Sequence, residues 1–317
     1  MKPDENSPFT GIVVYRHYKE NKMKSKGKIV KMAYAKTGFT IVELLVVMSI
    51  IVILLSLLLP SLNLVKRYAR VVVQKNLFRN IDSGLQAFEI DFKEYPDSGA
   101  TDATNAQYCG AMKLAEAMAG QDGLGFNPNS KFTADDGSST AALYPRPAPS
   151  KPWPSWYEEN LRNRREFLEA KDVQICYLNG LYASSGWANA TKIALLCDVF
   201  RSVTNLTTSK RMGMPILYYK ADSSKLVHDV NNPDNVGNIY NYTDNQELLK
   251  LGLPWDTGTM PPLYQASGLK GQVFYEKTLD KSALPIERPH NKDSYILISA
   301  GWDGIYGTRD DVFNFAD

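Results

Sequence analysis

The stretch Phe39–Leu59 reads FTIVELLVVMSIIVILLSLLL and contains one charged residue, Glu43, among 21. At the rise of an α-helix it is about 32 Å long, which matches the ~30 Å hydrocarbon core of a bilayer. The apolar region of a secretory signal is usually only ~7–15 residues long, and no Ala-x-Ala cleavage site follows this stretch. The sequence therefore predicts one membrane-spanning helix rather than a removed signal peptide.

The charges that flank this helix predict its orientation. Residues 1–38 carry nine Lys and Arg against three Asp and Glu, a net charge of +6, whereas the whole chain has a net charge of +2. Flanks rich in Lys and Arg stay on the cytoplasmic side, so residues 61–317 are expected outside the cytoplasm. The small overall charge gives no global sign of nucleic-acid binding, and we predict no nucleic-acid partner.

The composition indicates a folded body without catalytic chemistry. Hydrophobic residues make up 44% and charged residues 22% of the chain, as is usual for globular proteins. The chain has three histidines and three cysteines, and no Cys-x-x-Cys pair. A zinc site, a disulfide framework and a histidine-dependent hydrolase are therefore not expected, and we predict that the chain is not an enzyme.

Glu43 is the one ionisable group within the apolar helix. A carboxylate inside a spanning helix costs roughly 2.5–3.5 kcal/mol on insertion scales. Two interpretations follow. In the first, Glu43 lies near the cytoplasmic end of the helix and reaches the membrane interface. In the second, a specific positive partner compensates its burial.

The stretch Lys36-Thr37-Gly38-Phe39-Thr40-Ile41-Val42-Glu43 resembles the N-terminal processing signal of type IV pilins and type II secretion pseudopilins, the major pseudopilins in particular. The resemblance implies that prepilin peptidase cuts between Gly38 and Phe39 and that the new terminus, Phe39, is N-methylated. Glu43 would then remain charged as the fifth residue of the mature chain. The new α-ammonium group of one subunit could neutralise Glu43 of a neighbour inside an apolar filament core.

The helix is predicted to continue beyond Pro60. That proline either kinks the helix, as its position in the family suggests, or ends it at the membrane surface. Farther on, apolar residues recur at spacings of three or four, which is typical of one helical face. They are Leu62, Val65, Ala69, Val73, Leu77, Ile81, Leu85, Phe88 and Phe92. The helix should end near Phe92, before Tyr95-Pro96, a segment that also resembles the end of the pseudopilin helix.

We divide the chain into a basic leader that is removed (1–38), a transmembrane and filament-core helix (39–59), an amphipathic second half of the helix (60–96) and a globular head (97–317) with a loop-rich insertion at about 97–210. Leaders of this family are short, so translation could start at Met23 or Met32 instead of Met1. Short β-branched or aromatic runs predict an α+β fold, a long helix under an antiparallel sheet. Strands are expected at 173–178, 193–200, 216–220, 273–275 and 295–299, and short helices at 110–120 and 245–250.

The C-terminal loop 299–314 holds Asp303, Asp310 and Asp311 between glycines. Carboxylates spaced in this way can turn their oxygens toward a hard cation. The loop resembles the acidic C-terminal loop of major pseudopilins, and the resemblance implies that Asp303, Asp310 and Asp311 bind Ca²⁺. The alternative is an Asp-Gly turn without metal. Arg309 favours that alternative because it can neutralise a carboxylate itself.

Cys176 and Cys197 lie 21 residues apart on strands that are predicted to be neighbours. An oxidising compartment outside the cytoplasm would permit a disulfide between them. Buried free thiols are the commoner outcome for such a pair, and we expect two free thiols.

Together these features predict a structural subunit of a type II secretion-like pseudopilus or a type IV pilus-like filament. The resemblance implies single-pass insertion in a bacterial inner membrane, with the head in the periplasm or at the cell surface. It implies as partners the prepilin peptidase and methyltransferase, copies of the chain, other pseudopilins and an inner-membrane assembly platform. An alternative is a surface pilin whose enlarged head binds a sugar or a cell surface. A third hypothesis, a membrane-anchored enzyme, predicts an uncut chain.

Overall fold

The structure is a computed structural model of the 317-residue chain. It describes residues 38–134, 143–144, 157–169, 171–182, 187, 193–264, 268–283 and 285–315. The predicted leader lies outside these residues except for Gly38, and so do the three candidate start methionines. The chain forms two units, Met1–Ser56 and Leu57–Asp317, which are described separately.

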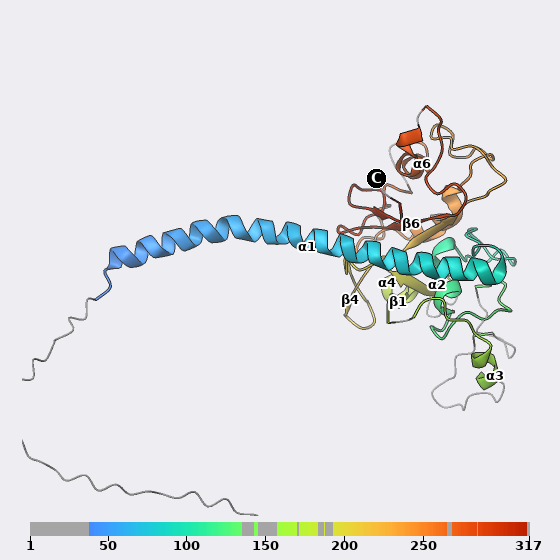
Figure 1. Ribbon diagram of the computed structural model, residues 1–317, viewed down its shortest axis with the longest axis horizontal. Helices are drawn as coiled ribbons and strands as arrows, with labels where there is room; N and C mark the ends of the chain where they lie inside the picture. Colours follow the sequence, from blue (N-terminus) through green and yellow to red (C-terminus); the bar gives the residue numbers. More distant parts are fainter. Residues whose placement is uncertain are drawn as a thin grey trace, which may run out of the picture. The chain divides into compact units, whose positions relative to one another are not determined.

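Helix α1 (Ile41–Phe92) begins in the first unit and ends in the second (Figure 1). Among the described residues it is the one helix that is long and apolar enough to cross a membrane. Its most apolar 18-residue window has a mean hydropathy of 3.0, and none of that window is buried. The helix continues through Pro60, so the interpretation of Pro60 as a helix stop is wrong, and the predicted end at Phe92 is confirmed.

The second unit contains three small antiparallel sheets, which confirms the predicted α+β class. Strand β1 (Gln174–Tyr177) pairs with β2 (Ala194–Cys197), and β3 (Val203–Thr204) pairs with β4 (Arg211–Met212). The third sheet has the order β5 (Leu217–Lys220), β6 (Tyr295–Ser299), β7 (Val312–Phe313). The helices are α2 (Gly110–Ala119), α3 (Tyr157–Arg162), α4 (Leu178–Leu181), α5 (Gln246–Leu249) and α6 (Gln272–Thr278), with 3₁₀ turns at Tyr242–Asn245 and Lys281–Ala283.

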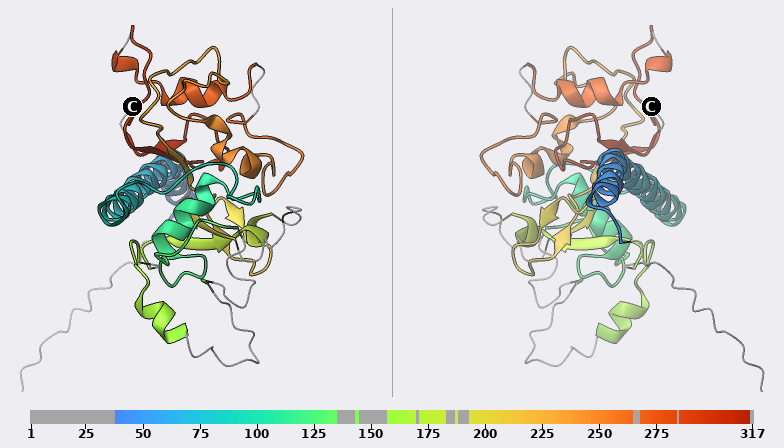
Figure 2. Two further views of the ribbon diagram at one scale, coloured as in Figure 1. Left: turned by 90° about the vertical axis from the view of Figure 1, so that its right-hand side faces the viewer. Right: turned by 90° about the vertical axis from the view of Figure 1, so that its left-hand side faces the viewer.

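The sheet of β5, β6 and β7 is buried on both faces. Successive side chains of a strand point to opposite faces, and here the two faces belong to different core clusters. Tyr218 and Leu297 pack in the cluster that contains Ile81 of α1. Tyr219 packs in the cluster that contains Phe274 of α6. Helices α1 and α6 therefore cover opposite faces of this sheet (Figures 1 and 2).

The predicted apolar stripe of α1 is buried only in its later part. Four of its members are at most 4% exposed: Leu77, Ile81, Leu85 and Phe88. Three earlier members, Leu62, Val65 and Val73, are 43%, 63% and 51% exposed. The head already contacts the helix at Arg70 and Gln74, but it buries the apolar stripe only from Leu77 onward, where the packing partners come from α2, β2, β5 and β6. The prediction that the stripe packs under the head is thus wrong before Leu77.

The prediction of a strand at 273–275 is also wrong, because these residues lie in α6. An apolar run of three residues fits either element, and the neighbours decide between them. Gly271, with φ of +79°, begins the helix, and the buried residues Phe274, Tyr275 and Thr278 follow at helical spacing. The other predicted strands, and the helices at 110–120 and 245–250, are confirmed within a few residues.

Candidate functional site

The junction between Gly38 and Phe39 lies just before α1. Gly38, Phe39 and Thr40 belong to no helix or strand, and the Phe39 side chain is 76% exposed. Among the described residues, no atom lies within 4 Å of the place where a Cβ on Gly38 would stand. The predicted cleavage site is therefore accessible backbone, and the fold itself does not require glycine at position 38.

Glu43 and Thr40 form a reciprocal cap at the start of α1. The backbone N–H and the hydroxyl of Thr40 both donate to Oε2 of Glu43 at 2.9 Å. The backbone N–H of Glu43 donates to Oγ1 of Thr40 at 3.2 Å. This is a capping box, and its carboxylate also lies in the first helical turn, where the helix dipole favours negative charge. The Thr-x-x-Glu spacing was a signal for this cap that the sequence analysis did not use.

The cap leaves Glu43 without a cation. Among the described residues, Thr40 is its hydrogen-bond partner, no basic side chain forms an ion pair with it, and its side chain is exposed. A positive partner for Glu43 must therefore come from outside the described chain. Pairing of Glu43 with Phe39 of a neighbour stays a prediction.

The apolar part of α1 contains serines whose hydroxyls are satisfied within the helix. Ser49 and Ser56 donate to the carbonyl oxygens of Val46 and Ile53, each at 2.7 Å. Such back-bonding lets a hydroxyl sit in an apolar environment without an unpaired donor. This part of α1 therefore exposes a nearly uniform apolar surface.

The three aspartates of the C-terminal loop hold the loop together through hydrogen bonds. Oδ1 of Asp303 accepts the N–H of Ile305 at 2.8 Å, and Oδ2 of Asp310 accepts the N–H of Asp303 at 2.9 Å. Oδ2 of Asp311 accepts the N–H of Gly307 at 2.9 Å. These are the contacts of an Asp-Gly turn.

The same loop does not gather a ligand set for calcium. In the described part of the chain, no group of three or more His, Cys, Asp or Glu side chains is placed to hold a metal ion. Burial of the Asp311 side chain raises its pKa to about 7, and Lys277 Nζ, 3.4 Å from its Oδ2, opposes that shift. Lys277, rather than the expected Arg309, is the cation beside these carboxylates. Calcium binding at Asp303, Asp310 and Asp311 stays a prediction that this geometry does not favour.

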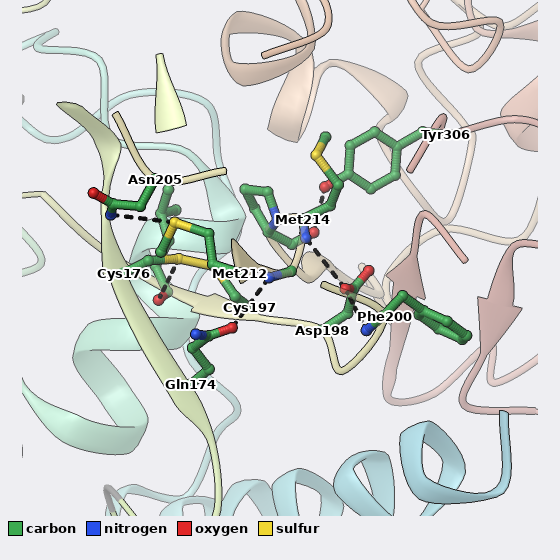
Figure 3. The surroundings of a disulfide bond; sticks show 12 residues. Gln174, Cys176, Cys197, Asp198, Phe200, Asn205, Met212, Met214 and Tyr306 are labelled. Carbon is green, nitrogen blue, oxygen red and sulfur yellow. Dashed lines mark hydrogen bonds between the residues drawn. A yellow bond between two sulfur atoms is a disulfide. The ribbon is translucent and has the colours of Figure 1, made fainter. Parts of the chain in front are cut away.

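Cys176 and Cys197 form a disulfide between β1 and β2 (Figure 3). Their Cα atoms are 6.5 Å apart, and both residues are buried. The two strands are neighbours, as predicted, but our expectation of two free thiols is wrong. The free cysteine among the described residues is Cys109, which is buried.

Asp198, next to the disulfide, connects β2 to two other segments of the head (Figure 3). Its Oδ1 accepts the N–H groups of Phe200 and Met214, each at 3.2 Å, and its Oδ2 accepts the hydroxyl of Ser299 at 2.8 Å. Burial raises the pKa of Asp198 to about 7. The carboxyl group is fully occupied in packing the head, so it has a structural role.

Comparisons with known proteins agree with the N-terminal features. Residues 34–59 match the family described as the prokaryotic N-terminal methylation motif. No curated protein and no solved structure matches the chain. The motif implies processing by prepilin peptidase and filament assembly with pilin-like subunits, and the single apolar helix is consistent with a single-pass membrane anchor. The methylation motif, together with a long apolar N-terminal helix joined to an α+β head, thus supports a type IV pilin-like protein.

Proposed function

We propose that the chain is a structural subunit of a type II secretion-like pseudopilus or a type IV pilus-like filament. Prepilin peptidase cuts it after Gly38, Phe39 becomes the methylated terminus, and the subunit then enters a filament through α1. Before assembly, the subunit is anchored in the bacterial inner membrane with its head outside the cytoplasm. An inner-membrane platform then adds it to the filament. It catalyses no reaction itself.

One observation carries this proposal. An apolar helix that no other described part of the chain covers begins two residues after the cleavage site of the methylation motif. None of the most apolar window of α1 is buried. Burial of apolar surface contributes about 25 cal/mol per Å², so a helix like this one is stable only inside a membrane or against other helices. Release from the membrane therefore requires that other subunits cover the same surface, as a filament does.

A surface pilin with a binding head is the second candidate function. A pocket of about 410 Å³ beside the disulfide is lined by apolar side chains such as Ile175 and Met212, by Lys210 and by neutral polar side chains. Asn179, Asn205, Thr207 and Thr208 supply amides and hydroxyls of the kind that bind sugar hydroxyls. Recovery of the protein in a sheared surface fraction, with binding to a glycan, would favour this candidate over a periplasmic pseudopilus.

The test of the leading proposal is intact-mass and N-terminal peptide analysis of the protein from native membranes. The expected terminus is N-methyl-Phe39. Cells without active prepilin peptidase provide one control, and Gly38→Val provides another. Because no atom of the described residues lies within 4 Å of a Cβ placed on Gly38, loss of cleavage in Gly38→Val would reflect a requirement of the peptidase. An uncut wild-type chain in cells that process other prepilins would refute the proposal and favour the anchored enzyme.

A further inference from the structure

A groove of about 460 Å³ lies beside α1 in the second unit. One side of the groove is formed by Val73 and Leu77 of α1, and the other by the residues that precede β1 and follow β2, including Val173 and Val199. Leu77 and Val173 are buried, whereas Val73 is 51% exposed. The groove thus has apolar walls and opens to solvent along the helix.

The groove is bordered by three basic residues, Arg70, Lys171 and Arg201, of which Lys171 forms an exposed ion pair with Glu169. Arg70 donates from Nη1 to the carbonyl oxygen of Phe200 at 2.6 Å, which fixes its guanidinium group at the rim. Arg70 also lies over the ring of Trp302, 4.7 Å from the ring centroid. Position 70 is therefore a cation that is held in place.

Arg201 is the second notable cation of the groove. Its φ is +56°, a left-handed conformation that costs a non-glycine residue roughly 1–2 kcal/mol. No carboxylate of the described residues forms an ion pair with it. The groove also contains two acids, but Asp172 is exposed at the surface and Asp198 is bonded to Ser299. We call this surface, residues 70, 73, 77, 171, 199 and 201, the basic groove.

A surface of complementary charge lies at the end of the same helix and just beyond it. Ile90 is 68% exposed, Asp91 follows it in α1, and Glu94 lies two residues past the end of α1; both acids are also exposed. Asp91 is 3.9 Å from Arg165 and Glu94 is 3.1 Å from Lys220, but the Glu94 side chain is 72% exposed. Ion pairs between exposed groups are weak and exchange readily. We call Ile90, Asp91 and Glu94 the acidic ridge.

We propose that the basic groove of one subunit binds the acidic ridge of a second copy of the chain. Ile90 fills the apolar space beside Val73, and the carboxylates of the ridge face the cations of the rim. The inference rests on the proposed function, because it describes one contact between neighbours in the filament.

The position of the two surfaces determines the kind of assembly. Val73 and Ile90 are 17 residues apart on one helix, about 25 Å at helical rise. A contact between two different surfaces is heterologous, and repetition of a heterologous contact that does not close gives an open filament. Parallel copies offset by about 25 Å satisfy the contact. Glu43 is four residues from Phe39, about 6 Å at helical rise, so the groove links a more distant neighbour than that charge pair would.

Cysteine cross-linking in the full chain tests the contact. The variant Val73→Cys/Ile90→Cys, oxidised in native membranes with an added oxidant, is expected to give a ladder of dimers, trimers and longer species. Val72→Cys/Ile90→Cys is the matched control, because Val72 is 59% exposed, adjacent in sequence and not part of the groove. It is expected to remain monomeric, as are the three single variants. Asp91→Lys in the double-cysteine chain should lower the cross-linked yield several-fold.

The same samples separate the possible outcomes. Processing at Phe39 and pelleting of assembled protein are measured for every variant. Assembled protein that gives no ladder from Val73→Cys/Ile90→Cys, or gives equal ladders from the Val72 control, overturns the contact but leaves the proposed function intact. Dimers from a single variant would mean a symmetric contact and would also overturn it. Failure of the wild type to be cut or assembled would overturn both proposals.

Discussion

The division of α1 at Leu77 predicts that two similar substitutions in one apolar stripe differ sharply in effect. Ile81→Ala removes a side chain that is fully buried between the head and the helix. Val73→Ala removes one that is 51% exposed in the single chain. Both positions belong to the face that was predicted from the sequence, so the pair isolates burial from helical position.

The magnitudes follow from the burial of the two side chains. Ile81→Ala removes three carbon groups at about 0.8 kcal/mol each, and the cavity left behind brings the expected loss to roughly 3 kcal/mol. Val73→Ala removes two carbon groups that are half in water, a loss of about 0.8 kcal/mol. The better helix propensity of alanine offsets roughly 0.5 kcal/mol of that loss. The free energy of unfolding should therefore fall by about 3 kcal/mol in one variant and hardly change in the other.

Thermal unfolding of the unassembled full chain in detergent, followed by near-UV circular dichroism, measures the difference. For a domain of this size about 2–4 °C is lost per kcal/mol, so Tm should fall by roughly 6–12 °C for Ile81→Ala and by less than about 2 °C for Val73→Ala. Equal shifts in the two variants would mean that the head covers the helix as far as Val73. That result would refute the division of α1.

Three further predictions concern the head and the cap. Replacing both cysteines of the Cys176–Cys197 pair by serine should lower the free energy of unfolding in urea by about 3 kcal/mol, because the unfolded chain then regains the entropy lost by closing a loop of this length. A reductant should lower the stability of the wild type to the same value. Because the folded pKa of Asp198 is raised to about 7, the folded state binds more protons than the unfolded state between about pH 4 and 7, and stability falls as the pH rises through that window. Asp198→Asn, which can still accept two N–H groups and donate to Ser299, should remove up to about 4 kcal/mol of that fall; an unchanged pH profile would contradict the assignment. Glu43→Gln keeps a residue that suits the capping box but removes the charge, so normal processing with lost assembly is expected, and normal assembly would exclude the charge pair.

Local features of the sequence predicted the helix boundaries well. The end of α1 at Phe92 followed from Tyr95-Pro96, since the residue before proline disfavours helical backbone. The end of α2 at Ala119 followed from Gly120, whose φ is +74°. These signals act through the backbone of one or two residues, so they need no knowledge of tertiary packing.

Features that depend on distant contacts were not predictable in this way. The period of the α1 stripe identifies a face but does not say how far along the helix the head reaches. The pairing of Cys176 with Cys197 depends on the register of β1 and β2, which no local pattern reveals. The basic groove joins residues 70, 171 and 201 from three segments, and its capacity to bind depends on that juxtaposition.

The apolar side chains of helix α1 thus fall into three stretches, each of which is buried by a different environment. Residues 41–59 are exposed and almost wholly apolar, which suits a bilayer or a bundle of like helices. Residues 77–92 carry the apolar face that the head of the same chain buries. The stretch between them exposes apolar side chains such as Leu62 and Val65, which a membrane of ordinary thickness does not reach. The described part of the head contacts this stretch near its end, at Arg67, Arg70 and Gln74. In the proposed filament, a neighbouring subunit would supply the apolar and acidic groups that cover its exposed residues. The membrane segment is covered by apolar groups both in the bilayer and in the proposed filament. The exposed residues of the middle stretch are covered only in the filament, so their burial contributes most to the free-energy difference between assembled and separate subunits.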